Sequence, residues 1–212
     1  HLALTIVFNA LLVWQNCLAA EVTRHEADVC VYGGTASGVM AALAAGKEGS
    51  KVILIEPTRW LGGMTGGGIN HLDWGKGNTV GGSTLKILTE GLEKLERGHE
   101  GNAIVGIGHK AYRERFKKAV EDRGITVIYD HRLGTVDVGE STIDSPTRQR
   151  PIAMNESIAG NKGGNSIRSI TLDYAPVDKT GCPIPEPKKR DAATVSAKVF
   201  IDCSYEGDLL AL

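Results

Sequence analysis

A hydrophobic strand, a glycine-rich turn and a helix of small residues follow one another directly in the stretch VYGGTASGVMAALAAG, residues 31–46. A second apolar stretch, KVILI at 51–55, comes after a short connection and completes one strand–helix–strand unit. Strands that are apolar at consecutive positions are typical of parallel sheets that are covered on both faces. The sequence therefore predicts an α/β fold with a parallel sheet.

The glycines of the turn predict contact with a phosphate. In a Rossmann-like unit the turn reads GxGxxG, and the phosphates lie at the N-terminus of the helix. Gly33 and Gly38 match the outer glycines, whereas Thr35 stands at the middle position. Gly34 beside it supplies backbone freedom, and the hydroxyls of Thr35 and Ser37 can donate to phosphate oxygens. The residues expected to bind a dinucleotide here are Gly33, Gly34, Thr35, Ala36, Ser37 and Gly38.

An acidic residue ends the second strand. Glu56 follows Gly38 by 18 residues, where an acid is expected to bind the ribose hydroxyls of the adenosine. NAD and FAD would both satisfy a turn and an acid of this kind. The next stretch, EPTRWLGGMTGGGINHLDWG at 56–75, contains a glycine doublet that suits a flavin, whose ribityl chain and ring lie flat along backbone that carries no side chains. We expect Gly62 and Gly63 to lie beside the cofactor, with Met64 and Thr65 facing it.

This stretch resembles the FAD-dependent oxidoreductases of the glutathione-reductase-like, two-dinucleotide-binding superfamily, and more narrowly a secreted bacterial group with a WLGGMT signature. The resemblance runs from about Asp28 to the last residue. It implies that FAD is the cofactor and that Gly62 and Gly63 lie by its pyrophosphate and ribityl chain. It also implies that GGGINHLDWGKGNTVGG, at 66–82, lies under the isoalloxazine ring.

Two later segments carry the same resemblance. GITVIYDHRLGTV, at 124–136, resembles a strand pair whose second member contacts adenine through its backbone, at or near Leu133. VFIDCSYEGD, at 199–208, stands where the family has an A-T-G motif followed by an acid, which implies cofactor contacts at Cys203 and Asp208. Cys-Ser-Tyr replaces Ala-Thr-Gly at this motif.

The catalytic residues are less clearly marked. His71 and Asp73, two apart in a glycine-rich loop, could exchange a proton with a substrate or could hydrogen-bond the loop. In flavin enzymes the cofactor carries the hydride chemistry, so no catalytic base is required from this segment.

The domain organisation follows from composition along the chain. Residues 1–20 hold an apolar run followed by small residues, the pattern of a cleaved secretory signal peptide, which implies a secreted or periplasmic protein. The run is too short to span a bilayer. Residues 21–212 then form one FAD-binding domain with expected helices at 83–97 and 109–123 and a β-rich insertion at about 139–194. The chain begins with His1 and stops inside an expected helix, so we take it as the N-terminal part of a longer protein.

Charge and cysteine content exclude several other functions. The chain has 24 basic and 25 acidic residues with no basic stripe, so nucleic acid is not expected as a partner. Cleavage of the signal would leave Cys30, Cys182 and Cys203, whose spacing forms neither a disulfide framework nor a metal motif.

The sequence therefore predicts a FAD-dependent oxidoreductase that transfers hydride to or from an unknown small organic substrate. The 212-residue segment alone, without the C-terminal part of the same protein, should hold FAD poorly and be inactive. Two alternatives stay open: a NAD-dependent dehydrogenase, and a sugar-acting protein of the polysaccharide lyase type with FAD in a non-redox role.

Overall fold

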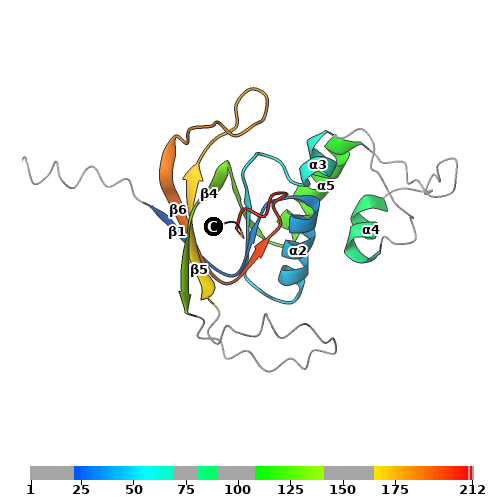
Figure 1. Ribbon diagram of the computed structural model, residues 1–212. Helices are drawn as coiled ribbons and strands as arrows, with labels where there is room; N and C mark the ends of the chain where they lie inside the picture. The colour runs from blue at the N-terminus through cyan, green and yellow to red at the C-terminus, as the bar shows by residue number, and fades with distance from the viewer. Residues whose placement is uncertain (1–21, 69–80, 90–107, 141–164, 210, 212) are drawn as a thin grey trace, which may run out of the picture.

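The computed structural model describes residues 22–68, 81–89, 108–140, 165–209 and 211 (Figure 1). The expected signal peptide, the expected catalytic candidates His71 and Asp73, and the second half of the helix expected at 83–97 lie outside the described residues. In chain order the elements are β1 Thr23–Tyr32, α2 Ala36–Lys47, β2 Val52–Glu56, α3 Gly63–Gly67, α4 Gly82–Thr89, α5 His109–Asp122, β3 Thr126–Tyr129, β4 His131–Glu140, β5 Asn165–Tyr174 and β6 Lys189–Asp202.

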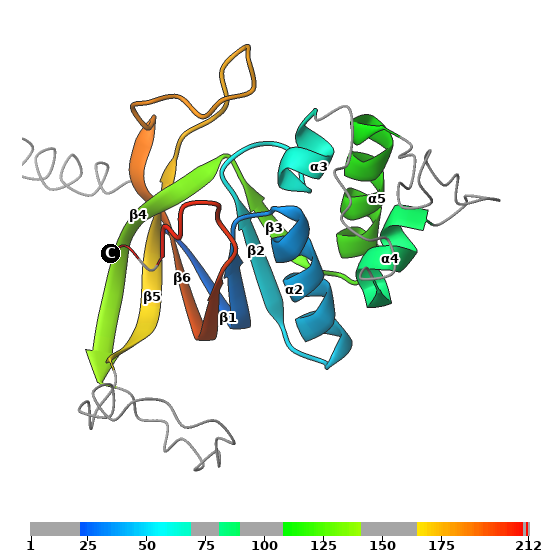
Figure 2. The same cartoon turned by 45° about the vertical axis from the view of Figure 1, so that its right-hand side comes forward.

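One six-stranded sheet organises the described residues, with the strand order β3-β2-β1-β6-β5-β4. Strands β3, β2, β1 and β6 run parallel, whereas β5 and β4 join β6 in antiparallel pairs. Helices α2 and α5 lie on the side of β1 and β2, and β4 and β5 form the far edge (Figure 2). The α/β fold with a mostly parallel sheet is confirmed, and the expected β-rich insertion contributes strands to this same sheet.

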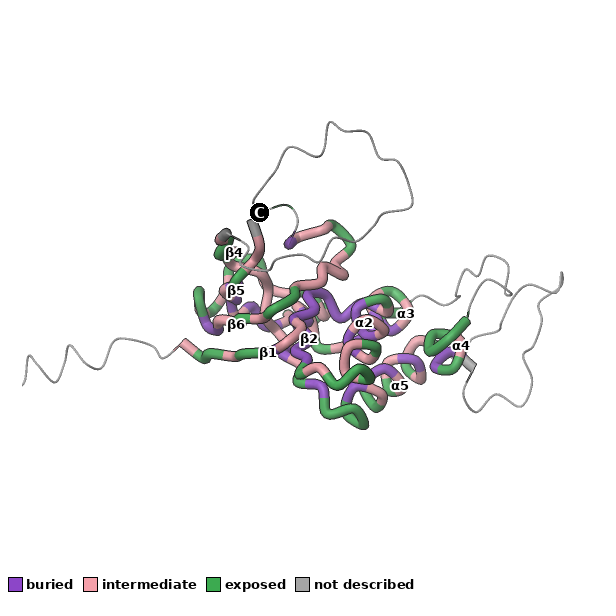
Figure 3. The backbone as a smooth tube through the Cα atoms, turned by 90° about the horizontal axis from the view of Figure 1, so that it is seen from below, coloured by how far each residue is buried: buried purple, intermediate pink, exposed green. Residues whose placement is uncertain are grey.

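Both faces of strands β1 and β2 are covered, as the apolar sequences of these strands predict. On one face Val31 and Leu54 pack with Val39 of α2 and Phe116 of α5. On the other face the alternate residues of β1 and β2 pack with apolar residues of β5 and β6; this second cluster includes Cys30, Tyr32, Ile53, Ile55, Ile170, Leu172 and Val195. The buried parts of the tube in Figure 3 follow this arrangement and concentrate in β1, β2 and the inner side of α2.

Strand β1 is longer than the sequence pattern indicates. The apolar pattern indicates a strand directly before the glycine turn, but Thr23–Ala27 already pairs with Ala193–Ala197 of β6. Strand β2 begins opposite Val29, so among the described strands this first half of β1 pairs with β6 alone. Backbone hydrogen bonds rather than burial hold it, and hydrophobic periodicity does not detect such a segment.

Beyond β6 the chain makes tight turns through residues 203–209, and Ala211 N donates to Gly207 O at 3.1 Å. No helix within the described part of the chain is both long and apolar enough to cross a membrane.

Candidate cofactor-binding site

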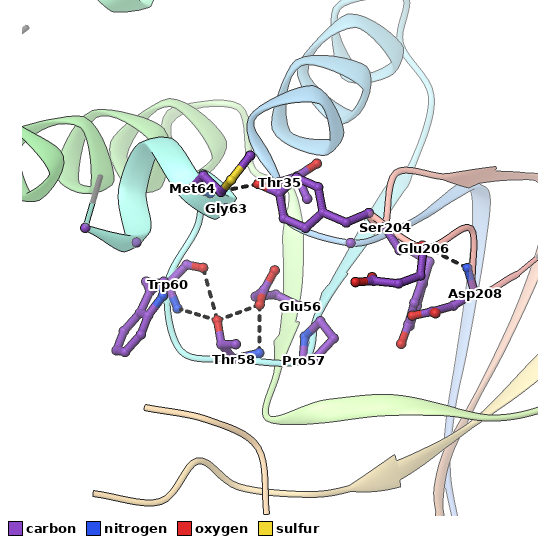
Figure 4. Close-up of a pocket in the computed structure, with 15 residues that line it drawn as sticks. Thr35, Glu56, Pro57, Thr58, Trp60, Gly63, Met64, Ser204, Glu206 and Asp208 are labelled. Carbon is purple, nitrogen blue, oxygen red and sulfur yellow. Dashed lines mark hydrogen bonds between the residues drawn. The ribbon is translucent and has the colours of Figure 1, made fainter. Parts of the chain in front are cut away.

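The carboxyl ends of β1, β2 and β6 meet at one edge of the sheet, where open α/β sheets bind their ligands. A pocket of about 490 Å³ lies there. Figure 4 shows Glu56, Thr58 and Trp60 along one side of it and Ser204, Glu206 and Asp208 along another. The full lining is Tyr32, Gly33, Thr35, Glu56, Pro57, Thr58, Trp60, Gly63, Met64, Gly67, Gly68, Ser204, Tyr205, Glu206 and Asp208.

The outer glycines of the turn are required by the chain itself. Gly33 has a φ of +93°, and a Cβ on it would lie 2.7 Å from the backbone carbon of Cys203. A Cβ on Gly38 would collide with the carbonyl oxygen of Gly33. The absence of both side chains lets the end of β6 cross the turn and lets α2 begin close against it.

The Thr35 hydroxyl fastens this turn from within. It is buried, donates to Cys203 O at 2.9 Å and accepts from Gly38 N at 3.2 Å, which caps α2. Its distance to Ser37 Oγ is 2.9 Å. Because a hydroxyl has one proton, Ser37 is the donor in that last bond. Neither proton therefore points to a phosphate in this arrangement, unlike the expectation from the sequence.

Glu56 is a buried acid with three hydrogen-bond donors around it. Its Oε2 accepts from Gly34 N at 2.8 Å, and its Oε1 accepts from Thr58 N at 2.7 Å and Thr58 Oγ1 at 2.6 Å. Burial raises the pKa of the carboxyl above its ordinary value, and the bonds from Thr58 and Gly34 oppose that rise. A Cβ on Gly34 would lie 2.6 Å from Oε2, so the second glycine of the turn gives the carboxylate its place.

The glycine pair after β2 packs against side chains of this chain. Gly62 N donates to Gly34 O at 2.8 Å, which ties the two glycine-rich turns together. A Cβ on Gly62, whose φ is +100°, would meet the ring of Phe116 at 2.5 Å. A Cβ on Gly63, whose φ is +51°, would collide with the hydroxyl of Tyr205. Each glycine is therefore needed whether or not a ligand lies beside it.

A hydrogen-bond network lies on the β6 side of the pocket. Tyr32 Oη accepts from Leu133 N at 3.0 Å and bonds the carboxylate of Asp208. Burial raises the pKa of Tyr32 to about 12. Burial, together with the charges of Glu206 and Asp202, raises the pKa of Asp208, and the bond from Tyr32 opposes that rise. Leu133, expected to contact adenine through its backbone, gives its N–H to Tyr32.

Trp60 lines the end of the pocket beside β2, and Arg113 lies behind it. Trp60 lies with the guanidinium carbon of Arg113 4.5 Å from its ring centroid, and Arg113 Nε donates to Gly66 O at 3.0 Å. A Cβ on Gly181, in the connection between β5 and β6, would collide with the same indole. Trp60 is therefore held between α5 and the β5–β6 connection.

The sequence prediction and the pocket overlap in part. Six predicted residues line it: Gly33, Thr35, Glu56, Gly63, Met64 and Asp208. Eight lie behind the lining or beside it: Gly34, Ala36, Ser37, Gly38, Gly62, Thr65, Leu133 and Cys203. Gly67 and Gly68 of the lining belong to the segment 66–82 that was expected under the flavin ring. Lining residues for which the sequence predicted no individual cofactor contact are Tyr32, Pro57, Thr58, Trp60, Ser204, Tyr205 and Glu206. A threonine two residues after Glu56 was a usable signal, since Thr and Ser commonly bond nearby backbone and acids in turns.

Two of the described cysteines have raised pKa values. Burial raises the pKa of Cys30 to about 12 and also raises the pKa of Cys203. Within the described ranges, no three His, Cys, Asp or Glu side chains come together in a group that could hold a metal ion.

The sequence profile of the family "FAD dependent oxidoreductase" matches residues 28–158. The chain belongs to this family. FAD is accordingly its cofactor, and the family favours neither a nicotinamide dehydrogenase nor a non-redox, sugar-acting protein. No curated protein sequence matches the chain significantly.

Solved structures superpose on this chain to different extents. THI4 of Thermovibrio ammonificans superposes with a TM-score of 0.52 at 15% identity, covering 95% of this chain and 65% of that one. A flavoprotein/dehydrogenase from Cytophaga hutchinsonii has a TM-score of 0.47 at 12% identity, and the match covers 88% of this chain and 41% of that one. The myxobacterial chondrochloren halogenase CndH has a TM-score of 0.47 at 12% identity, and the match covers 85% of this chain and 37% of that one. The chain therefore spans less than two thirds of the length of each of these proteins.

Proposed function

We propose that the pocket binds the adenosine and pyrophosphate of FAD and that the protein uses the cofactor for hydride transfer with a small organic substrate. The observation that carries this proposal is the common pocket of Glu56 and the turn before α2. Glu56 and the turn before α2 line one space, which supports this proposal because a dinucleotide needs an acid for its ribose and a helix terminus for its phosphates.

The N–H groups at the start of α2 are the proposed phosphate donors. The first N–H groups of a helix have no partner within the helix, and the helix dipole favours an anion there. Ala36 and Ser37 are the first two residues of α2. Since the Thr35 hydroxyl is engaged with Cys203 and Gly38, Thr35 contributes to this site by fixing the turn.

The Glu56 carboxylate fits the ribose. A carboxylate offers about four acceptor positions, and Gly34 and Thr58 occupy three of them. One position on Oε2 remains for a ribose hydroxyl, and Glu56 lines the pocket. The buried acid thus fits the cofactor by its donor and acceptor chemistry, not only by its place in the sequence.

Bound FAD supplies two-electron chemistry, and the protein supplies orientation and exclusion of water. We also propose the finer assignment to the glutathione-reductase-like group with the WLGGMT signature. In support, Trp60, Gly63 and Met64 of that motif line the pocket. His71 and Asp73 stay predictions as catalytic groups. Export from the cytoplasm, and a further part of the same protein that completes the substrate side, are part of the same proposal.

Spectroscopy of the purified full-length protein tests the function. We expect the visible absorbance of a bound flavin. We also propose that FAD is bound non-covalently, so acid precipitation should leave the FAD in the supernatant. Candidate sugars and alcohols, added without oxygen, should bleach this absorbance when one is a substrate. A colourless protein that binds a nicotinamide dinucleotide instead, or activity that survives chemical reduction of the flavin, would contradict the proposal.

A further inference from the structure

The loop after β6 carries a tyrosine that reaches across the pocket to α3. Tyr205 Oη accepts a hydrogen bond from Met64 N at 2.7 Å, and the two residues are separated by 141 positions in the chain. Tyr205 nevertheless stays 59% exposed and belongs to the pocket lining. It stands at the position where the resemblance to the family implies a glycine.

The backbone around Tyr205 is held in place by its neighbours. Asp202 Oδ1 accepts from Ser204 N at 2.9 Å and from Ser204 Oγ at 2.7 Å. Ser204 Oγ in turn accepts from Gly207 N at 3.0 Å and from Asp208 N at 2.9 Å. The exposure of Tyr205 therefore does not come from a loosely held loop. The fold presents this side chain to the pocket.

The end of the Tyr205 side chain lies beside both glycine-rich turns. A Cβ built on Gly63 would collide with its hydroxyl and would lie 3.2 Å from Thr35 Cα. The hydroxyl thus sits next to the turn that precedes α2, where the cofactor's phosphates are proposed to bind. Because Oη accepts from Met64 N, its own proton can be donated to an acceptor in the pocket.

We propose that Tyr205 is a cofactor-contacting residue that covers the pyrophosphate of FAD and slows its release. The inference rests on the proposed function, since it needs FAD in this pocket. An exposed aromatic ring with a polar tip, fixed beside a phosphate site, gains both apolar contact and one hydrogen bond when the ligand is present. The alternative role is a purely internal strap that joins the β6 loop to α3.

Two substitutions separate these roles. Tyr205→Phe keeps the ring and removes the hydroxyl, whereas Tyr205→Ala removes both. Tyr174→Phe is the matched control, because Tyr174 lies outside the pocket lining. The measurements are the FAD dissociation constant, the release rate seen as a rise in flavin fluorescence after dilution, and thermal unfolding of the apoprotein.

We expect Tyr205→Phe to weaken FAD binding and speed its release by about 2- to 10-fold, the range of one hydrogen bond. Tyr205→Ala should lose about 10-fold or more, since the ring contact is lost as well. Tyr174→Phe should bind as the unaltered protein does. The loss of FAD affinity in the two Tyr205 variants should be larger than the loss that a lower stability of the apoprotein alone would cause.

Three outcomes would overturn the inference. Unchanged FAD binding in both variants, with a less stable apoprotein, would leave Tyr205 as a strap. Tighter or faster binding in Tyr205→Ala would show that the ring occupies the cofactor's place. Absence of FAD binding in the unaltered protein would overturn the proposed function itself. This outcome is distinct from the first two, in which the unaltered protein binds FAD.

Discussion

The hydroxyl of Thr35 donates to the carbonyl of Cys203 at 2.9 Å, across 168 positions of the chain. The middle position of a GxGxxG turn normally carries glycine so that backbone can approach a pyrophosphate. Here the same position joins the end of β1 to the end of β6 and caps α2 at Gly38 N. A threonine in place of this glycine therefore adds internal hydrogen bonds at the lining of the pocket.

Thr35→Ala should destabilise the protein by about 1 to 3 kcal/mol, because it removes a helix cap and leaves the Cys203 carbonyl without this donor. Urea unfolding of the apoprotein measures the loss. Thr35→Ser, which keeps the oxygen, should recover most of it. Equal losses in the two variants would mean that the methyl group, and not the hydroxyl, holds the turn.

Glu56→Gln should weaken FAD binding about tenfold or more, because a charge-assisted bond to the ribose is lost. A glutamine also places an amide N–H₂ against donors of Gly34 or Thr58, which disturbs the loop. Thr58→Val controls for this effect, since it removes the 2.6 Å bond to Oε1 and keeps the charge. FAD titration of both variants should show the larger loss in Glu56→Gln, and equal losses would contradict a ribose contact.

The raised pKa of Glu56 predicts opposite effects of pH on folding and on binding. Burial raises the pKa above 4.5, so its contribution to apoprotein stability is present below 4.5 and is lost as pH rises through the folded value. FAD binding needs the ionised form, so affinity should fall as pH drops through that raised pKa.

Titration of FAD at a series of pH values, from neutral pH down into the ordinary range of a carboxyl group, measures this dependence. Glu56→Gln should flatten the part of the profile that Glu56 causes. A profile that is the same in the variant would assign the dependence to another group, of which Asp208 is the candidate because its pKa is also raised.

The mature protein should begin at or near Glu21 and be found outside the cytoplasm. The apolar run and the small residues that end at Ala20 motivate this prediction. N-terminal sequencing of material from the native host measures it. A mature chain that still carries residues 1–20 would be inconsistent with a cleaved signal.

Local sequence patterns were sufficient for the core of the fold. The apolar stretches directly before Gly33 and within 51–55 predicted two buried parallel strands, and the expected helix at 109–123 matches α5 at His109–Asp122. The first half of β1 escaped detection because Thr23–Ala27 is polar and is held by backbone pairing with β6. Hydrophobic periodicity detects buried segments, whereas this segment is mostly exposed and is stabilised by its pairing with β6.

The site was harder to predict because its bonds join distant parts of the chain. Glu56 could be placed from its spacing to Gly38, since both belong to one local unit. The partner of the Thr35 hydroxyl, the bond from Leu133 N to Tyr32, and the reach of Tyr205 to Met64 all depend on how β6 and β4 are arranged beside β1. Spacing within one segment contains no information about such pairs.

The pairing of β1 with β6 also sets the timing of folding during synthesis. Thr23 to Tyr32 align with Ala193 to Asp202, so the centre of the sheet joins two of its most widely separated strands. A nascent chain presents one long side of β1 without a partner until β6 has left the ribosome. Contacts of such high sequence separation form late and slowly, and unpaired strand edges aggregate. Shortened products that lack β6 should therefore depend strongly on chaperones to stay in solution.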